Sequence, residues 1–222
     1  IWSRLVGSEM CIRDRLKASQ NRDNLSTSLN GSKNIVCYDA VSITEILMPE
    51  LRIGVCYDFR NPTDSGVKNE TLYAQILEQV KWLDELGADL VWFTEHHFVE
   101  DGYLPSWIPV ASAMASITKR VRFGTDICLM PFNHPIRLAE DLAVLDNISG
   151  GRVDLGIGMG YAPHEFRGFG FPIARRVSLM NEGIEVLQRC FTGERFSYHG
   201  NRYQFSDVRI EPGYVQENGP PP

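Results

Sequence analysis

From residue 51 onward, a unit of apolar run, polar loop and amphipathic helix occurs four times, and this repeat constrains the fold more than any other feature. In the first unit, apolar residues in the stretch 70–86 recur at the three- and four-residue spacing of a helix. The predicted strands are 51–57, 90–93, 121–130 and 153–157, and the predicted helices are 70–86, 109–118, 136–147 and 176–191. Strands that alternate with helices predict an α/β fold with a parallel sheet and right-handed crossovers.

Two architectures begin with such units, a doubly wound sheet and a (β/α)₈ barrel. The loop after the first predicted strand lacks the glycine-rich phosphate fingerprint of a dinucleotide fold. Polar residues instead follow every predicted strand, and a barrel collects such residues at one rim. We therefore expect a partial (β/α)₈ barrel, made of its first four βα units and ending before a fifth strand. Aromatic residues that alternate over 196–205 around Gly200-Asn201 predict an added β-hairpin.

Composition limits the possible partners. The chain has 222 residues and a formal charge of -6, and no basic run is interleaved with aromatics, so we expect no nucleic-acid partner. No apolar run approaches membrane-spanning length. The five cysteines have no C-x-x-C spacing, which favours free thiols in a reducing compartment over disulfides or zinc. We expect a cytoplasmic protein without a membrane anchor.

The first 47 residues differ from the rest of the chain. They show no sustained helical or strand period, and the polar stretch 19–33 is too poor in apolar residues to hold itself folded. The stretch 5–15 resembles a translated sequencing adapter, and Met48 has the character of an initiator. We expect residues 1–47 to be a non-native or disordered leader and residues 48–222 to form the domain.

The sequence Glu95-His96-His97 directly follows the second predicted strand. At the carboxyl end of a buried parallel strand these side chains would lie where α/β proteins bind their ligands. A single histidine is most often structural, but two imidazoles beside a carboxylate suit proton transfer near neutral pH. A metal site is the rival interpretation. Adjacent residues of an extended strand point to opposite faces and no third ligand has suitable spacing, so we expect no metal.

Several motifs together resemble the bacterial luciferase-like flavin-dependent monooxygenases over residues 51–222. They are Trp92-x-x-Glu-His-His-Phe98, Gly124-Thr125 with Pro131, His134-Pro-x-Arg-x-x-Glu-Asp141, Leu145-Asp146, Ser149-Gly-Gly-Arg152, the glycines to Gly160, and Phe166-Arg-x-Phe-Gly170. The motifs are numerous, in order and similarly spaced. The resemblance implies a flavin-dependent oxidoreductase.

The resemblance also implies roles for individual residues. His96 would be the catalytic base beside the flavin ring, with His97 and Glu95 shaping the same wall. A non-prolyl cis peptide would support the ring at Asp126-Ile127, where luciferase has two alanines. At the tip of the fourth strand, luciferase has a reactive cysteine and a phosphate-contacting arginine.

The chain has Gly158, Met159 and Gly160 at that tip, so the arginine contact is absent. We expect Asp126, Ile127 and these three residues to line the cofactor site. The segment 134–146 is expected to be structural, with Arg137, Glu140, Asp141, Asp146 and Arg152 in an ion-pair network.

The implied reaction oxygenates a small organic substrate with O₂ and reduced FMN, supplied by a flavin reductase or by NAD(P)H. Loops 58–68 and 99–106 would roof the substrate pocket. Two alternatives stay open, a deazaflavin-dependent dehydrogenase that transfers hydride without O₂, and a non-catalytic flavin-binding protein. A homodimer is expected for the full-length protein, and a half barrel alone is expected to be inactive.

Overall fold

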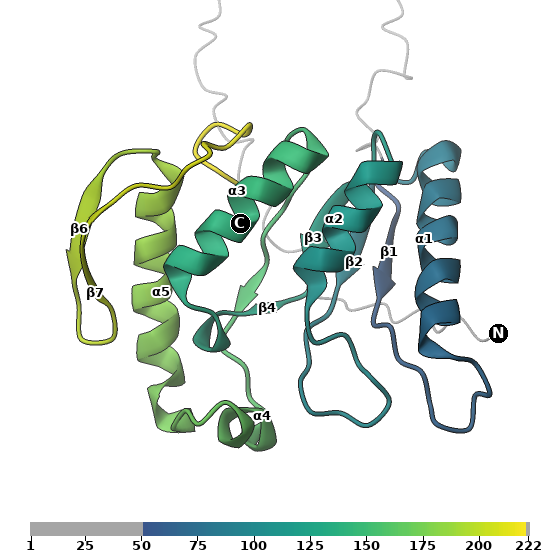
Figure 1. The fold of residues 1–222 in the computed structure, drawn as a ribbon, viewed down its shortest axis with the longest axis horizontal. Coiled ribbons are helices and arrows are strands. Elements are labelled where there is room, and N and C mark those ends of the chain that lie inside the picture. The colour runs from purple at the N-terminus through teal and green to yellow at the C-terminus, as the bar shows by residue number, and fades with distance from the viewer. Residues whose placement is uncertain (1–50, 221–222) are drawn as a thin grey trace, which may run out of the picture. The chain divides into compact units, whose positions relative to one another are not determined.

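The computed structural model describes residues 51–220, in which strands and helices alternate (Figure 1). In order, the elements are β1 (Gly54–Tyr57), α1 (Asn69–Leu86), β2 (Leu90–Phe93), α2 (Trp107–Ile117), β3 (Arg122–Thr125), β4 (Cys128–Leu129), α3 (Pro135–Ser149), β5 (Ile157–Gly158), α4 (Pro163–Gly168), α5 (Arg176–Phe191), β6 (Phe196–His199) and β7 (Gln204–Val208), with 3₁₀ turns at Met130–Phe132 and Ile173–Arg175. The predicted α/β class is confirmed. The expected leader 1–47 and the expected start at Met48 lie outside the described residues.

Parallel pairing organises the strands. β1, β2 and β3 form one sheet in that order, with Val55 opposite Val91 and Val91 opposite Phe123. β4 pairs in parallel with β5, and an isolated bridge joins Phe123 to Val153. The segment that holds β3 and β4 therefore has β2 on one side and the segment 153–158 on the other.

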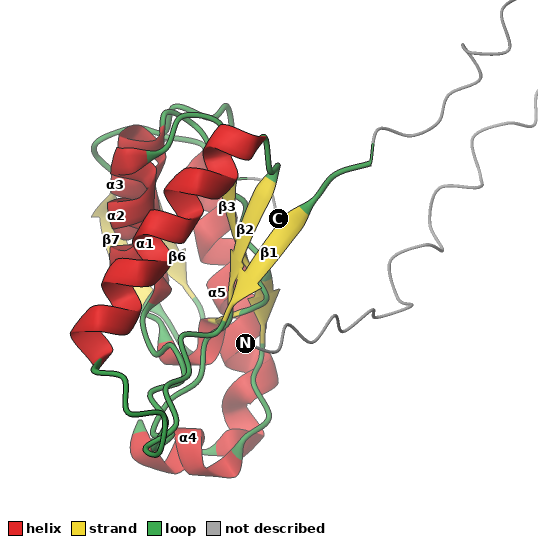
Figure 2. Ribbon diagram, turned by 90° about the vertical axis from the view of Figure 1, so that its right-hand side faces the viewer, coloured by secondary structure: helices red, strands yellow, loops and turns green. Residues whose placement is uncertain are grey.

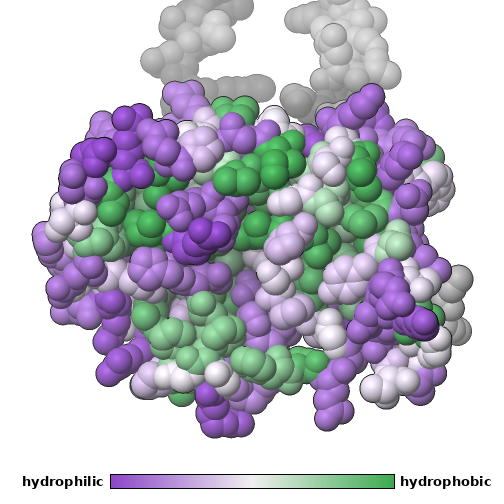
Figure 3. All heavy atoms as spheres, in the orientation of Figure 1, coloured by the Kyte–Doolittle hydropathy of each residue, from purple (hydrophilic) through white to green (hydrophobic). Residues whose placement is uncertain are grey.

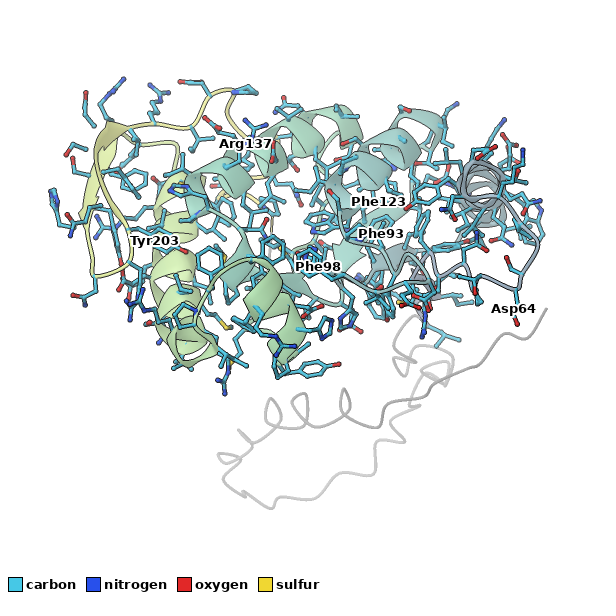
Figure 4. All side chains as sticks on the ribbon, turned by 60° about the horizontal axis from the view of Figure 1, so that its bottom comes forward. Asp64, Phe93, Phe98, Phe123, Arg137 and Tyr203 are labelled. Atoms are coloured by element: carbon cyan, nitrogen blue, oxygen red, sulfur yellow. The ribbon has the colours of Figure 1, made fainter. Side chains whose placement is uncertain are left out.

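The two faces of the β1–β3 sheet differ in burial. Val91 and Phe93 are 0% exposed, whereas Trp92 between them is 41% exposed. α1 and α2 lie on one side of β1 and β2 (Figure 2). Phe93 and Phe123 point to that side and stack with ring centroids 6.3 Å apart (Figure 4). The face that carries Trp92 is left open within residues 51–220.

Helix ends follow local sequence signals. Gly87 directly follows α1 and adopts a φ of 91°, and Gly150 directly follows α3 with a φ of 68°. Glycine tolerates this left-handed conformation because it has no Cβ. The buried Asp84 of α1 accepts N–H groups from residues 119–121, which fixes the turn between α2 and β3. Burial opposes ionisation of Asp84, but these three donors outweigh it and lower its pKa.

The predicted strand 121–130 is divided in the structure. It pairs with β2 up to Asp126, whose N–H donates to the Phe93 carbonyl at 2.7 Å. Beyond Ile127, the N–H of Cys128 donates instead to the Gly156 carbonyl at 2.8 Å. Because the pairing partner changes between these residues, one long strand becomes β3 and β4. The predicted strand 153–157 is likewise shorter, with a bridge at Val153 followed by β5.

The expected ion-pair network is wrong for two of its five members. Arg137 does pair with Asp141 at 3.0 Å and with Glu140 at 3.6 Å on the surface of α3. Asp146 is fully buried and accepts N–H groups from the chain at 215–216. Arg152 donates to carbonyl oxygens at the end of α2 and the start of β3. Both side chains hold backbone in place, a role that charge spacing does not reveal.

The predicted hairpin is present as β6 and β7, which pair antiparallel. It packs against α5, where the Tyr198 hydroxyl donates to Glu185 at 2.7 Å. Over the helices, apolar and polar side chains alternate at the surface (Figure 3), and Val144 and Ile148 of α3 are 47% and 46% exposed. No helix among the described residues is long and apolar enough to cross a bilayer.

Candidate functional site

The carboxyl ends of the parallel strands meet at one edge of the sheet. Tyr57, Phe93 and Thr125 end β1, β2 and β3 at the same level in the register. Asp58 and Asp126 follow β1 and β3, and the histidine pair follows β2. This edge comes forward in Figure 4. The structure therefore brings the residues that follow these three strands to one edge of the sheet.

His96 is the more accessible of the two histidines, with 26% of its side chain exposed. Its Nδ1 atom lies 3.0 Å from Oε1 of Glu165. Its ring meets Tyr103 edge-on at 4.5 Å between centroids and Tyr161 at 6.3 Å. Its Nε2 atom makes no hydrogen bond within residues 51–220. Glu165 therefore holds Nδ1, whereas Nε2 is available to contact a ligand.

Glu165 is a site residue that sequence analysis missed. It lies in the first turn of α4, which begins at Pro163, and its side chain is only 1% exposed. Its Oε1 atom also accepts the backbone N–H of His97 at 2.9 Å. Pro163, a residue type favoured in the first turn of a helix, was a sequence signal for this short helix, but not for the burial of Glu165.

His97 has a different environment from His96. Its Nε2 lies 3.0 Å from Oε1 of Glu95, and its side chain is 11% exposed. The rings of Phe132 and Phe169 meet it edge-on at 5.6 and 4.7 Å. His97 is therefore enclosed by aromatic rings, whereas His96 is partly open.

Glu95 is buried and uses both of its oxygens. One contacts His97, and the other accepts the backbone N–H of Leu129 at 2.9 Å. This second bond joins the end of β2 to β4. No three His, Cys, Asp or Glu side chains converge on a point in the part of the chain that the structure describes.

The peptide bond between Asp126 and Ile127 is cis, as the resemblance implies. The Ile127 side chain lies over Gly158, where a Cβ atom would overlap it. A Cβ atom at Gly156 would overlap the carbonyl oxygen of Thr125. Glycine at these two positions lets β5 approach the bend that follows β3.

Cys56 lies beside this bend on the open face of the sheet. Burial, together with the charges of Asp126 and Asp58, raises the pKa of its thiol. A thiol with a raised pKa stays protonated and is a poor nucleophile at neutral pH. We therefore assign Cys56 no covalent role.

The open face and rim fit the ring system of a flavin. Trp92, Ile127 and Met159 are 41%, 36% and 39% exposed there, which gives apolar surface for a planar ring. The Thr94 hydroxyl is buried and has no hydrogen-bond partner within residues 51–220, and it lies one residue before Glu95 at the tip of β2. Met159 offers no positive charge, so this position cannot pair with a phosphate.

The two loops expected to roof the pocket are tied together. The Asn61 N–H donates to the Asp101 carbonyl at 2.7 Å, and Arg60 pairs with the Asp101 carboxylate at 2.6 Å. The Arg60 guanidinium also lies over the Tyr103 ring at 5.1 Å. Tyr103 in turn contacts His96, so the loop pair forms one side of the surroundings of the accessible imidazole.

Comparison with known proteins gives this arrangement a family context. Residues 51–222 match the profile of the family described as luciferase-like monooxygenase. The alkanal monooxygenase alpha chain of the Kryptophanaron alfredi symbiont is 30% identical over 138 residues, which are 62% of this chain and 39% of that protein. The crystal structure of monooxygenase RslO1 from Streptomyces bottropensis superposes with a TM-score of 0.72 at 32% identity, covering 77% of this chain and 52% of RslO1.

Two more distant structures share the fold. The oxygenating constituent of 3,6-diketocamphane monooxygenase from Pseudomonas putida, in complex with FMN, has a TM-score of 0.65 at 21% identity, covering 76% of this chain and 48% of that one. An F420-dependent secondary alcohol dehydrogenase has a TM-score of 0.62 at 20% identity, covering 75% and 50%. The chain thus spans about half the length, or less, of the proteins to which it is similar.

Proposed function

The chain belongs to the luciferase-like monooxygenase family, and we propose that it carries the base-bearing part of a flavin-dependent monooxygenase that oxygenates a small organic substrate with O₂ and reduced FMN. The observation that carries this proposal is the environment of His96. Its imidazole is held at Nδ1 by the buried Glu165, is partly open to the rim, and has an available Nε2. A fixed and accessible imidazole is suited to accept or return a proton.

We further propose that β1 to β5, with α1, α2, α3 and α5, form the first four βα units of a (β/α)₈ barrel. Two observations support this architecture. Within residues 51–220, β1 pairs only with β2, and β5 pairs only with β4. The match to RslO1 covers 77% of this chain and 52% of that protein. The unpaired backbone at both edges is what adjoining barrel strands would cover. The activity we propose is accordingly that of the whole protein.

FMN is the cofactor we propose because the glycine-lined bend and the apolar rim accommodate a planar ring. When bound and reduced, FMN supplies the two electrons that oxygenation with O₂ requires. Trp92, Ile127 and Met159 would contact the ring, and the loops joined by Arg60 and Asp101 would restrict water. His96 would exchange a proton at Nε2 with the reacting substrate.

The electron donor we propose is a flavin reductase or NAD(P)H, and the whole protein is proposed to be a homodimer. The main alternative is a deazaflavin-dependent dehydrogenase, which uses the same rim. Met159 is neutral and contributes no phosphate contact to FMN or to a deazaflavin, so this position does not favour one cofactor over the other.

An oxygen electrode tests the proposed function. The whole protein is mixed with reduced FMN, generated by NADH and a flavin reductase, and with decanal, a cyclic ketone or an aromatic acid as probe substrates. Oxygen uptake coupled to product formation with at least one probe is expected. The contrary result is substrate oxidation with oxidised F420 under anaerobic conditions, together with no oxygen-dependent product from any probe.

A further inference from the structure

The neighbouring histidines make opposite use of their ring nitrogens. His96 presents Nδ1 to Glu165 at 3.0 Å, whereas His97 presents Nε2 to Glu95 at 3.0 Å. Both carboxylates are almost fully buried, with side chains 1% and 5% exposed. Two adjacent residues thus contact separate buried acids through different atoms.

The other contacts of these carboxylates show the direction of each hydrogen bond. Oε1 of Glu165 also accepts the backbone N–H of His97 at 2.9 Å, and Oε2 of Glu95 accepts the backbone N–H of Leu129 at 2.9 Å. A backbone N–H can only donate, so each acid has an oxygen that accepts, and an ionised carboxylate has no proton of its own to donate to a ring nitrogen. The ring nitrogen facing each acid must then carry the proton.

In a neutral imidazole one nitrogen donates and the other accepts. His96 is therefore the Nδ1–H tautomer with an electron pair at Nε2. His97 is the Nε2–H tautomer with its electron pair at Nδ1. The bond that one ring nitrogen makes determines which nitrogen is free for chemistry.

We propose that Glu165 is a positioning residue, whose buried carboxylate fixes His96 as the Nδ1–H tautomer and so leaves Nε2 to accept a proton at the rim. The catalytic meaning of this inference rests on the proposed function of His96. The tautomer itself depends only on the contacts above. Glu165 acts through His96 and has no contact of its own with the open face among those described.

The two carboxylates beside the histidines have separate roles. Glu95 fixes His97, whose ring is enclosed by Phe132 and Phe169 and is largely shielded. The Glu95 and His97 pair therefore supports the backbone, while the Glu165 and His96 pair prepares a proton acceptor.

Nitrogen-15 NMR of the histidine side chains tests the proposal in the labelled whole protein. Spectra recorded in mildly alkaline buffer, where the rings are neutral, distinguish a protonated from an unprotonated ring nitrogen. His96 is expected to show a protonated Nδ1 and an unprotonated Nε2, and His97 the reverse. An Nε2–H tautomer at His96 in the wild-type chain would overturn the proposal.

Glu165→Leu then tests the cause. This variant keeps apolar volume but removes the acceptor, so His96 is expected to shift toward the Nε2–H tautomer while His97 keeps its own tautomer. An unchanged Nδ1–H tautomer at His96 in a folded Glu165→Leu chain would overturn the role of Glu165. The His97 signal reports whether the variant is folded. If the leucine variant does not fold, Glu165→Met, which is unbranched and removes the same acceptor, replaces it in this test.

Kinetics of the whole protein separate this inference from the proposed function. Glu165→Leu is expected to lower kcat by up to the roughly 10²- to 10⁴-fold that a general base contributes, with KM within a few-fold. If His96 shifts to the Nε2–H tautomer in Glu165→Leu but kcat is unaltered, the positioning role is overturned. If wild-type His96 is the Nδ1–H tautomer but the whole protein has no oxygen-dependent activity, the proposed function is contradicted instead.

Discussion

Oε2 of Glu95 accepts the backbone N–H of Leu129 at 2.9 Å, a hydrogen bond between residues 34 positions apart in the chain. Through it, the carboxylate at the tip of β2 holds the start of the segment that follows the cis peptide. Its other oxygen holds His97 at 3.0 Å. Glu95 is thus a structural link between two strand ends beside the accessible His96.

Glu95→Ala is expected to destabilise the chain by about 3 kcal/mol. The substitution leaves the Leu129 N–H and the His97 Nε2–H without acceptors in a buried place, and each loss carries a desolvation cost. Urea unfolding measures the change. Glu78→Ala, on the exposed side of α1, is the matched control and should change stability by less than about 0.5 kcal/mol. Equal stability of the two variants would contradict the assigned role.

Gly156→Ala should cost about 2 kcal/mol, because its Cβ would overlap the Thr125 carbonyl oxygen, which belongs to backbone and cannot turn aside. Gly213→Ala is the matched control, since nothing lies within 4 Å of a Cβ at that position. Thermal unfolding of both variants measures the difference. A tolerated alanine at position 156 would show that β5 does not approach the bend as closely as described.

Stability is expected to fall in alkaline solution. The pKa of Tyr198 is raised to about 12 by burial, by its hydrogen bond to Glu185 and by the charge of that carboxylate. Burial likewise raises the pKa of the Cys190 thiol to about 12. The unfolded chain loses these protons at lower pH than the folded chain. The stabilisation is therefore complete below the pKa values of the two groups in the unfolded chain, and it is lost as the pH rises through about 12.

Urea unfolding as a function of pH measures this loss. Tyr198→Phe should reduce the slope of stability against pH between about pH 10 and pH 12, because it removes one of the titrating groups. Phenylalanine keeps the ring of this hairpin residue against α5, so the comparison isolates the hydroxyl. An identical slope in the variant and the wild type would contradict the assignment.

Local pattern was sufficient to predict most of the helices. The predicted helix 176–191 matches α5, and the predicted helix 70–86 differs from α1 by one residue. Their amphipathic periodicity is a property of neighbouring residues, so the sequence contains it directly. The cis peptide at Asp126 was found because it lies at a fixed place in a recognisable motif.

The missed features depend on contacts between distant residues. Glu165 reaches His96 across 69 positions and through a helix of six residues, which is too short to show a period. The division of the strand 121–130 depends on a change of hydrogen-bond partner, which composition does not record. Arg152 was expected to pair with carboxylates, but in the folded chain it donates hydrogen bonds to backbone carbonyl oxygens.

The central claim is that His96 is the base of a flavin-dependent oxygenation, and its replacement tests this most directly. The whole protein carrying His96→Ala is compared with the wild type and with His199→Ala, a change on the exposed hairpin, using reduced FMN, O₂ and the probe substrate that supports the highest oxygen uptake. We expect His96→Ala to lower turnover by about two to four orders of magnitude, with FMN binding within a few-fold, while His199→Ala stays at the wild-type rate. Wild-type turnover in His96→Ala would contradict the account.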